Sequence, residues 1–153
     1  MLGEDLKITG TIDIKILNRD NEVLKQWTQK NMILNTGILT LAQALAARSS
    51  IDFSYIAAGT RSTVASKTDT KLIDEVCRAE IIALTTNSID TAIFGTYFDF
   101  SQAPGMVINE VGLVVNGTTN LNSGTFFARS VLDEPIEKTA ENAFSITWAI
   151  RFE

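Results

Sequence analysis

The feature that most constrains the fold of this chain is a period-two alternation of apolar and polar residues. In the last such segment every second residue is large and apolar, and the residues between them are smaller or polar: Phe144, Ile146, Trp148, Ile150 and Phe152. Residues 8–16 alternate in the same way, with isoleucines on the apolar side. Because successive side chains of a β-strand point to opposite faces, both segments are predicted to be strands with one buried face.

Clusters of Gly, Asn, Ser and Pro divide most of the remaining chain into further short apolar stretches, which we interpret as strands. These predicted strands cover residues 22–27, 53–58, 76–85, 91–100, 108–115 and 124–132. Strands that follow one another without interleaved helices favour an antiparallel arrangement over a parallel α/β sheet. The sequence therefore predicts a mainly β fold, an antiparallel β-sandwich of about eight strands.

One segment departs from this alternation and predicts a short α-helix at about residues 37–48. Its apolar residues recur at helical spacing: Ile38, Leu41, Ala42, Leu45 and Ala46. Asn35 or Thr36 is expected to cap the first turn, because their side chains can accept hydrogen bonds from free backbone N–H groups. The helix then has one apolar face to bury.

The chain of 153 residues is predicted to form a single domain over residues 1–153. An apolar share of 45% is enough for one continuous core, and no repeat or linker divides the sequence. A long β-hairpin is expected at residues 6–27, and we interpret it as a contact arm that could be removed without unfolding the domain. The residues expected to make the contacts are Ile8, Ile12, Ile14 and Trp27.

Charge and cysteine content bear on partners and location. The 18 acidic residues outnumber 13 scattered basic ones, which disfavours nucleic acid as a partner. No apolar run approaches the length that crosses a bilayer, and no signal peptide is recognisable, so we expect no membrane partner and synthesis in a host cytoplasm. The single cysteine, Cys77, cannot form an internal disulfide and is expected to be a small buried residue.

The absence of histidine argues against most enzyme chemistry, since it removes the commonest general base and the commonest zinc ligand. One cysteine cannot build a thiolate metal cluster, and no glycine-rich loop opens a helix as a phosphate site would. We therefore expect no enzymatic activity, no cofactor and no metal.

Carboxylates could still support glycoside hydrolysis without histidine. The candidates near apolar strands are Asp74, Glu75, Glu80, Asp99 and Glu110. Ion pairing is the favoured interpretation, because an unpaired buried charge is costly. Glu75 or Glu110 is expected to pair with Arg78 or Arg129.

Aromatic residues also allow two interpretations. A stacking platform for sugars could be formed by Tyr97, Phe98, Phe100, Phe126 and Phe127, although such residues more often belong to the core. Residues 91–95 and 112–115 are apolar on both faces and need cover on the second one. The helix is expected to cover one of them, and a neighbouring subunit the other.

Several motifs, in the same order along residues 8–152, resemble small tail-fibre-like and baseplate-associated virion proteins of tailed bacteriophages. The motifs are Lys30–Gly37 (KNMILNTG), Tyr55–Thr60 (YIAAGT), Leu72–Arg78 (LIDEVCR), Asn109–Leu113 (NEVGL), Phe127–Val131 (FARSV), Ile136–Thr139 (IEKT) and Ser145–Phe152 (SITWAIRF). The resemblance implies a β-sandwich component of a virion that oligomerises. Residues 61–66 depart from the small glycine-rich loop of that family, so no recognition role is carried over to them.

We therefore expect a structural virion protein, associated with the tail, the baseplate or a fibre. It would act by strand addition and apolar packing. Its expected partners are copies of itself, in trimers or hexamers, and other virion proteins. The alternatives are a capsid decoration protein, a carbohydrate-binding receptor module that uses the aromatic residues and the loop 60–70, and a small hydrolase that relies on carboxylates alone.

Overall fold

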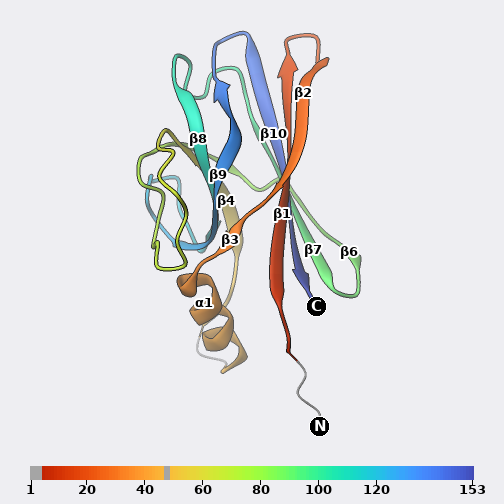
Figure 1. The fold of residues 1–153 in the computed structure, drawn as a ribbon, viewed down its shortest axis with the longest axis vertical. Helices are drawn as coiled ribbons and strands as arrows, with labels where there is room; N and C mark the ends of the chain where they lie inside the picture. The colour runs from red at the N-terminus through yellow and green to blue at the C-terminus, as the bar shows by residue number, and fades with distance from the viewer. Residues whose placement is uncertain (1–4, 47–48) are drawn as a thin grey trace.

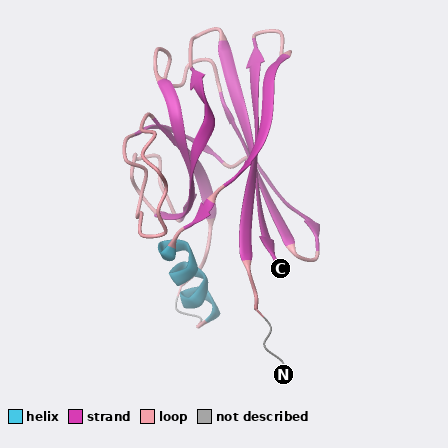
Figure 2. Ribbon diagram, viewed as in Figure 1, coloured by secondary structure: helices cyan, strands magenta, loops and turns pink. Residues whose placement is uncertain are grey.

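A computed structural model, which describes residues 5–46 and 49–153, contains two antiparallel sheets packed face to face (Figure 1, Figure 2). Its elements are β1 (Ile8–Asn18), β2 (Val23–Lys30), β3 (Met32–Ile33), α1 (Asn35–Leu45), β4 (Phe53–Gly59), β5 (Glu75–Glu80), β6 (Ala83–Ser88), β7 (Thr91–Phe98), β8 (Val107–Val115), β9 (Thr125–Glu137) and β10 (Asn142–Phe152). Sheet A has the order β2-β1-β10-β7-β6, and sheet B has the order β3-β9-β8-β4-β5. The prediction of a mainly β, antiparallel sandwich with one helix is confirmed.

The strand count differs from the predicted eight because the chain changes sheets in two places. The segment predicted as one strand, residues 76–85, is split between β5 in sheet B and β6 in sheet A. At the split, Ile81 N–H donates to Ser54 of sheet B, and Ile82 N–H donates to Gly95 of sheet A. The short strand β3, which the alternation did not reveal, marks the second crossing, where β2 leaves sheet A.

The main core lies between the two sheets and consists of the residues that the alternation placed on the apolar faces. Ile14, Phe94 and Trp148 of sheet A meet Leu113 and Phe127 of sheet B, and all five are almost fully buried. Full burial of side chains of this size stabilises the fold by about 1.5–3 kcal/mol each. The period-two pattern is therefore explained by the contact between the sheets.

The N-terminal hairpin is not a separable contact arm, which corrects the expectation for residues 6–27. β1 lies inside sheet A between β2 and β10, and its Ile12 and Ile14 are fully buried in the main core. Ile8 and Trp27 are partly buried and pack against the same core. Removing the hairpin would expose the centre of the sandwich, because its isoleucines face the opposite sheet rather than solvent.

Helix α1 begins earlier than predicted and buries a different face. Its N-cap is Leu34, whose side chain cannot accept a hydrogen bond, so the capping expected from Asn35 or Thr36 is wrong. Thr36 instead donates its hydroxyl to the carbonyl of Phe126 on β9. The helix ends at Leu45, and residues 47–48 of the predicted span lie outside the described residues.

The side of α1 that meets β9 carries small residues. Gly37 and Thr40 are buried, and a Cβ on Gly37 would come within 2.4 Å of the Phe127 carbonyl oxygen. This close approach turns the predicted apolar face outward: Ile38 and Leu45 are 44% and 90% exposed. The expectation that the apolar face of the helix is buried is therefore wrong within this chain.

A second apolar cluster lies on the outer face of sheet B, where residues 112–115 were expected to need cover. Val114 and Phe126 pack there with Leu72, which is fully buried although it belongs to the loop between β4 and β5. This loop, residues 60–74, covers the strand in place of the predicted helix or neighbouring subunit. The outer face of residues 91–95 stays partly exposed at Ile93.

Candidate functional site

The buried acids of sheet B hold loops in place. Glu110 and Arg129 are fully buried, and Arg129 Nε lies 3.1 Å from Glu110 Oε1. Glu110 also accepts hydrogen bonds from three backbone N–H groups of the loop 60–74: Arg61, Ile73 and Asp74. Arg129 reaches the same loop through Asp69 and the carbonyl of Thr63. One ion pair therefore fastens both ends and the middle of this loop to the sheet.

The second ion pair does the same for the loop between β8 and β9. Arg78 Nε lies 2.6 Å from one carboxylate oxygen of Glu75, and a second guanidinium nitrogen lies 2.8 Å from the other. Glu75 accepts the N–H of Asn122, and Arg78 donates to Ser123. Both of the pairs left open by the sequence thus form, and their hydrogen-bonding groups are occupied by the protein itself.

The other acids considered for catalysis lie apart from one another. Asp74 accepts a hydrogen bond from the Thr60 hydroxyl, and Glu80 is exposed. Asp99 caps a turn, where the hydrogen bond from the Ser101 hydroxyl holds its pKa below the usual range. Within residues 5–46 and 49–153, no three acids or cysteines converge as a metal site would require.

The aromatic residues considered as a sugar platform are largely core. Phe98, Phe126 and Phe127 are fully buried, and Phe98 stacks on Phe144 with ring centroids 4.4 Å apart. Phe100 is partly exposed, and the Arg19 guanidinium lies over its ring at 4.5 Å. These side chains do not form one exposed stacking surface.

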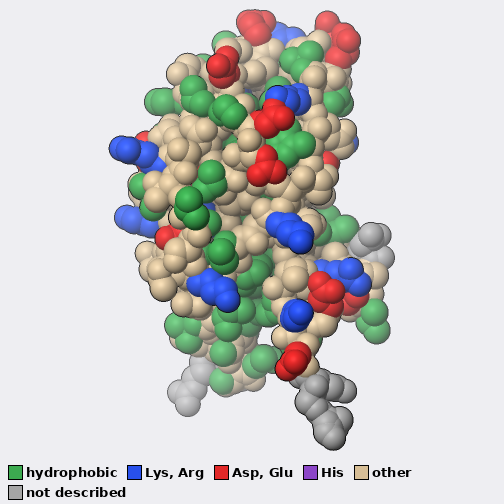
Figure 3. All heavy atoms as spheres, in the orientation of Figure 1, with side chains coloured by type: hydrophobic (Ala, Val, Ile, Leu, Met, Phe, Trp, Pro, Cys, Tyr) green, Lys and Arg blue, Asp and Glu red, His purple; other side chains and the backbone are tan. Residues whose placement is uncertain are grey.

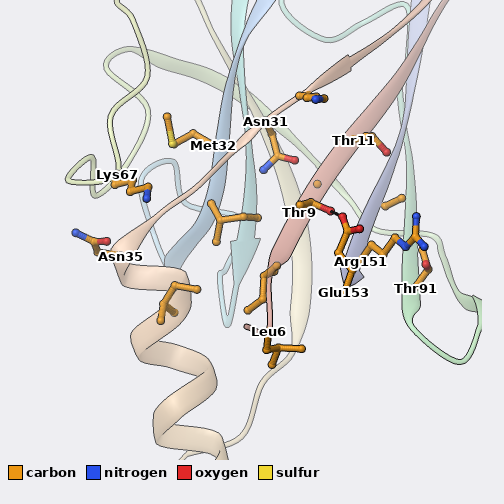
Figure 4. A pocket seen from close by; sticks show the side chains of 16 residues that line it. Leu6, Thr9, Thr11, Asn31, Met32, Asn35, Lys67, Thr91, Arg151 and Glu153 are labelled. Carbon is orange, nitrogen blue, oxygen red and sulfur yellow. Dashed lines mark hydrogen bonds between the residues drawn. The ribbon is translucent and has the colours of Figure 1, made fainter. Parts of the chain in front are cut away.

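The candidate site is instead a cleft of about 800 Å³ at the end of the sandwich where the sheets diverge (Figure 4). It exists because β2 pairs with β1 only as far as Thr11 opposite Lys30. Beyond Lys30 the chain crosses to sheet B, and the first residues of β1 lose their neighbour on that side. The cleft has apolar walls from β1, β3 and α1, formed by Leu6, Ile8, Met32, Ile33 and Ile38. Its charged residues are Lys30, Lys67, Arg151 and Glu153.

Asn31 lies at the inner end of this cleft, where the chain crosses between sheets. Its side-chain nitrogen and oxygen are both buried, yet neither has a hydrogen-bond partner in the described part of the chain. The carboxamide occupies the space beside Gly10, since a Cβ on Gly10 would lie 1.8 Å from Asn31 Oδ1. A buried amide without partners costs about 1–3 kcal/mol, so the site is energetically incomplete.

Large apolar side chains are exposed around the cleft. They belong to α1, to the start of β1, to the β6–β7 turn and to the C-terminal end of β10, and we call this region the lower end, as it is drawn in Figure 1. The most exposed are Leu6, Leu39, Leu45 and Ile89 at 72%, 56%, 90% and 106%. The space-filling view shows hydrophobic side chains gathered over α1 and in the hollow beside it (Figure 3).

No protein-family model, curated protein or solved structure matches this chain. The resemblance to phage virion proteins therefore stays a prediction. Across the ranges that the structure describes, no helix has the length and apolar character needed to cross a bilayer.

The sequence did not reveal the cleft. Ile8 was singled out, but as part of an arm, and the unsatisfied amide of Asn31 was not considered. The available signal was the single polar residue Asn31 between the end of one extended segment and the apolar run that follows it. That signal alone does not show that two strands part there.

Proposed function

We propose that this protein is a non-catalytic structural component that works by docking to copies of itself and to other proteins. The observation that carries the proposal is the apolar lower end, where α1 turns Ile38, Leu39 and Leu45 outward beside an open cleft. Soluble monomers seldom expose large contiguous apolar patches, and such patches commonly mark interaction sites.

The buried acids support a structural role. Glu75 and Glu110 each form an ion pair and accept backbone N–H groups, so neither is free to take a proton from a substrate or give one to it. A general acid or base must reach the reacting group directly or through one water molecule. Their geometry is suited to holding loops rigidly on sheet B.

The ordered resemblance over residues 8–152 supports a place in the virion of a tailed phage. We propose an association with the tail, the baseplate or a fibre after synthesis in the host cytoplasm. Closed rings of three or six copies would bury the lower end, because repeated contacts of one kind close into rings when the rotation permits. A capsid decoration protein would use the same surface but would be present in far more copies in each particle.

Native mass spectrometry of the intact protein tests this proposal. We expect the wild-type chain to be present in defined multiples of its mass. Leu39→Glu, at the exposed face of α1, should shift these multiples to the single chain, because a charge would be placed within the apolar contact. Leu24→Glu is the matched control, since Leu24 is 61% exposed near the β1–β2 turn at the opposite end. A wild-type protein that stays a single chain at every concentration, alone and with the other virion proteins, would overturn the proposal.

A further inference from the structure

The first residues of β1 present an open strand edge to the cleft. Lys7 exchanges two backbone hydrogen bonds with Glu153 on the β10 side, and the Gly10 carbonyl accepts the Asn31 N–H on the other side. Alternate residues of an antiparallel ladder direct their N–H and C=O groups to opposite sides. Leu6 and Ile8 therefore direct theirs away from β10, as Gly10 does. No described strand or loop pairs with these groups of Ile8.

We propose that this edge binds the same edge of a second copy, in an antiparallel pair related by a two-fold axis at Ile8. The inference rests on the proposed function and names the contact that carries it. An open edge is self-complementary under a two-fold axis, since the N–H and C=O of Ile8 in one copy meet the C=O and N–H of Ile8 in the other. Strand addition to an exposed sheet edge is a common mode of protein docking.

The charges along the strand favour this register over the neighbouring one. With Ile8 opposite Ile8, Lys7 of each copy lies opposite Thr9 of the other. The alternative that keeps the same hydrogen-bonding parity places Leu6 opposite Ile8, and Lys7 then lies directly opposite Lys7. Like charges in directly opposed positions destabilise a strand pair, so the register centred on Ile8 is preferred.

The side chains of the incoming strand suit the walls of the cleft. Leu6 and Ile8 both line the cleft, and Leu6 is 72% exposed in the single chain. A two-fold axis perpendicular to the sheet places these residues of both copies on the same face, toward Ile33 and Ile38. Four apolar side chains are then brought together where solvent otherwise enters the cleft, and their contact adds hydrophobic stabilisation to the backbone pairing.

The unsatisfied amide of Asn31 lies where the incoming strand would end. In this register Leu6 of the second copy lies opposite Gly10, and the Asn31 carboxamide lies beside Gly10. A carboxamide offers both a donor and an acceptor, which matches the two groups of a peptide bond. The second copy therefore supplies what no described residue of the first chain supplies.

A two-fold contact also restricts the assembly. It is compatible with a dimer, or with a hexamer made of three such pairs, and it is incompatible with a simple three-fold ring. Of the two ring sizes proposed above, this inference selects the hexamer.

Site-directed cross-linking in the full chain tests the register. In Ile8→Cys the two Cα atoms of a hydrogen-bonded pair would lie about 5.5 Å apart, within the range that a disulfide bridges. In the control Thr9→Cys they would lie roughly 8 Å apart on the other face of the sheet, beyond that range. The native Cys77 is buried and is not expected to react.

We expect mild oxidation to double the mass of Ile8→Cys on a non-reducing gel and to leave Thr9→Cys unchanged. If wild-type protein assembles but Ile8→Cys gives no covalent dimer, or Thr9→Cys cross-links equally well, the β1 contact is wrong while the proposed function stands. A wild-type protein that is always a single chain overturns both.

Hydrogen exchange of the wild-type protein gives a second measurement that needs no substitution. The Ile8 N–H should exchange more slowly as protein concentration rises, because it becomes bonded in the pair. The Thr9 N–H faces β10 in the single chain and should not depend on concentration. An Ile8 amide whose exchange rate is the same in dilute and assembled samples would overturn the inference.

Discussion

The outer face of sheet B and the cleft at the lower end both bury polar groups, but they satisfy them differently. On sheet B, Glu110 and Arg129 are fully buried, and each also bonds to the loop that covers them. In the cleft, the Asn31 carboxamide is buried without a partner. Because an unsatisfied buried group lowers stability without contributing a contact, this difference separates a place that holds the fold together from a place that is complete only with a partner.

Two amides in neighbouring positions make the same contrast at closer range. Gln29 on β2 donates to Ser130 and to the carbonyl of Val131, and it accepts from Asp133. Asn31, two residues later, has none of these bonds, because the chain has already left sheet A. The same chemical group thus ties β2 to β9 in one position and remains open in the next.

The largest expected effect comes from breaking the Glu110–Arg129 pair. Glu110→Gln should lower the free energy of unfolding by about 3–5 kcal/mol, because it leaves the Arg129 charge buried without its counter-ion. Urea denaturation measures this change. Glu141→Gln, which breaks the exposed pair with Arg19, is the matched control and should cost about 0–1 kcal/mol. Equal losses in the two variants would show that burial of the pair does not matter.

Arg78→Met should have a smaller effect, about 1.5–3 kcal/mol, because Glu75 keeps the bond from the Asn122 N–H. Limited proteolysis should then cut first within residues 116–124, the loop that Arg78 holds. In Glu110→Gln the first cut should fall within residues 60–74. Cleavage in the same loop in both variants would contradict the assignment of one ion pair to each loop.

The two amides provide a test in which the signs are opposite. At a concentration where the chain is single, Asn31→Leu should raise the free energy of unfolding by about 1 kcal/mol, because it removes an unsatisfied group of similar shape. Gln29→Leu should lower it by about 1–3 kcal/mol, because its partners lose their bonds. Thermal or urea unfolding distinguishes them. A loss of stability in Asn31→Leu would mean that the amide is already satisfied.

Cys77 shows a third way to bury a polarisable group, which is to keep it uncharged, and its effect at neutral pH is the smallest. Burial, with a further contribution from Glu75, raises the pKa of its thiol from 9.0 to about 12. At pH 9 the thiolate fraction of the folded chain, and hence its alkylation rate, should be at least roughly 100-fold below that of urea-unfolded chain. Comparable rates would contradict the burial.

The same pKa gives a dependence of stability on pH. The folded-state pKa lies above the unfolded value, so the protonated thiol favours the folded chain. This contribution is present below pH 9 and is lost as the pH rises toward 12. In Cys77→Ala the decline in stability over this interval should be shallower, as measured by urea denaturation at each pH.

Some parts of the fold and of the site could be predicted from local pattern. Alternation located the inward faces of β1 and β10, and the cost of an unpaired buried charge identified the right acids and arginines on sheet B. The helix shows the opposite case: its apolar residues were expected to be buried, but the close approach of Gly37 to Phe127 on β9 turned Ile38 outward. Which face of α1 packs was decided by the backbone distance that a glycine permits.

The sequence by itself determined that the chain forms strands with one apolar face and that its buried charges have partners of opposite sign. Both follow from local rules, since side chains alternate along a strand and an unpaired charge is costly inside a protein. Only the tertiary structure decided where β2 leaves β1 for the other sheet. A period of two specifies which side chains face inward but not which strand lies alongside, and the open edge at Ile8 and the unsatisfied amide of Asn31 both arise from that choice of neighbour.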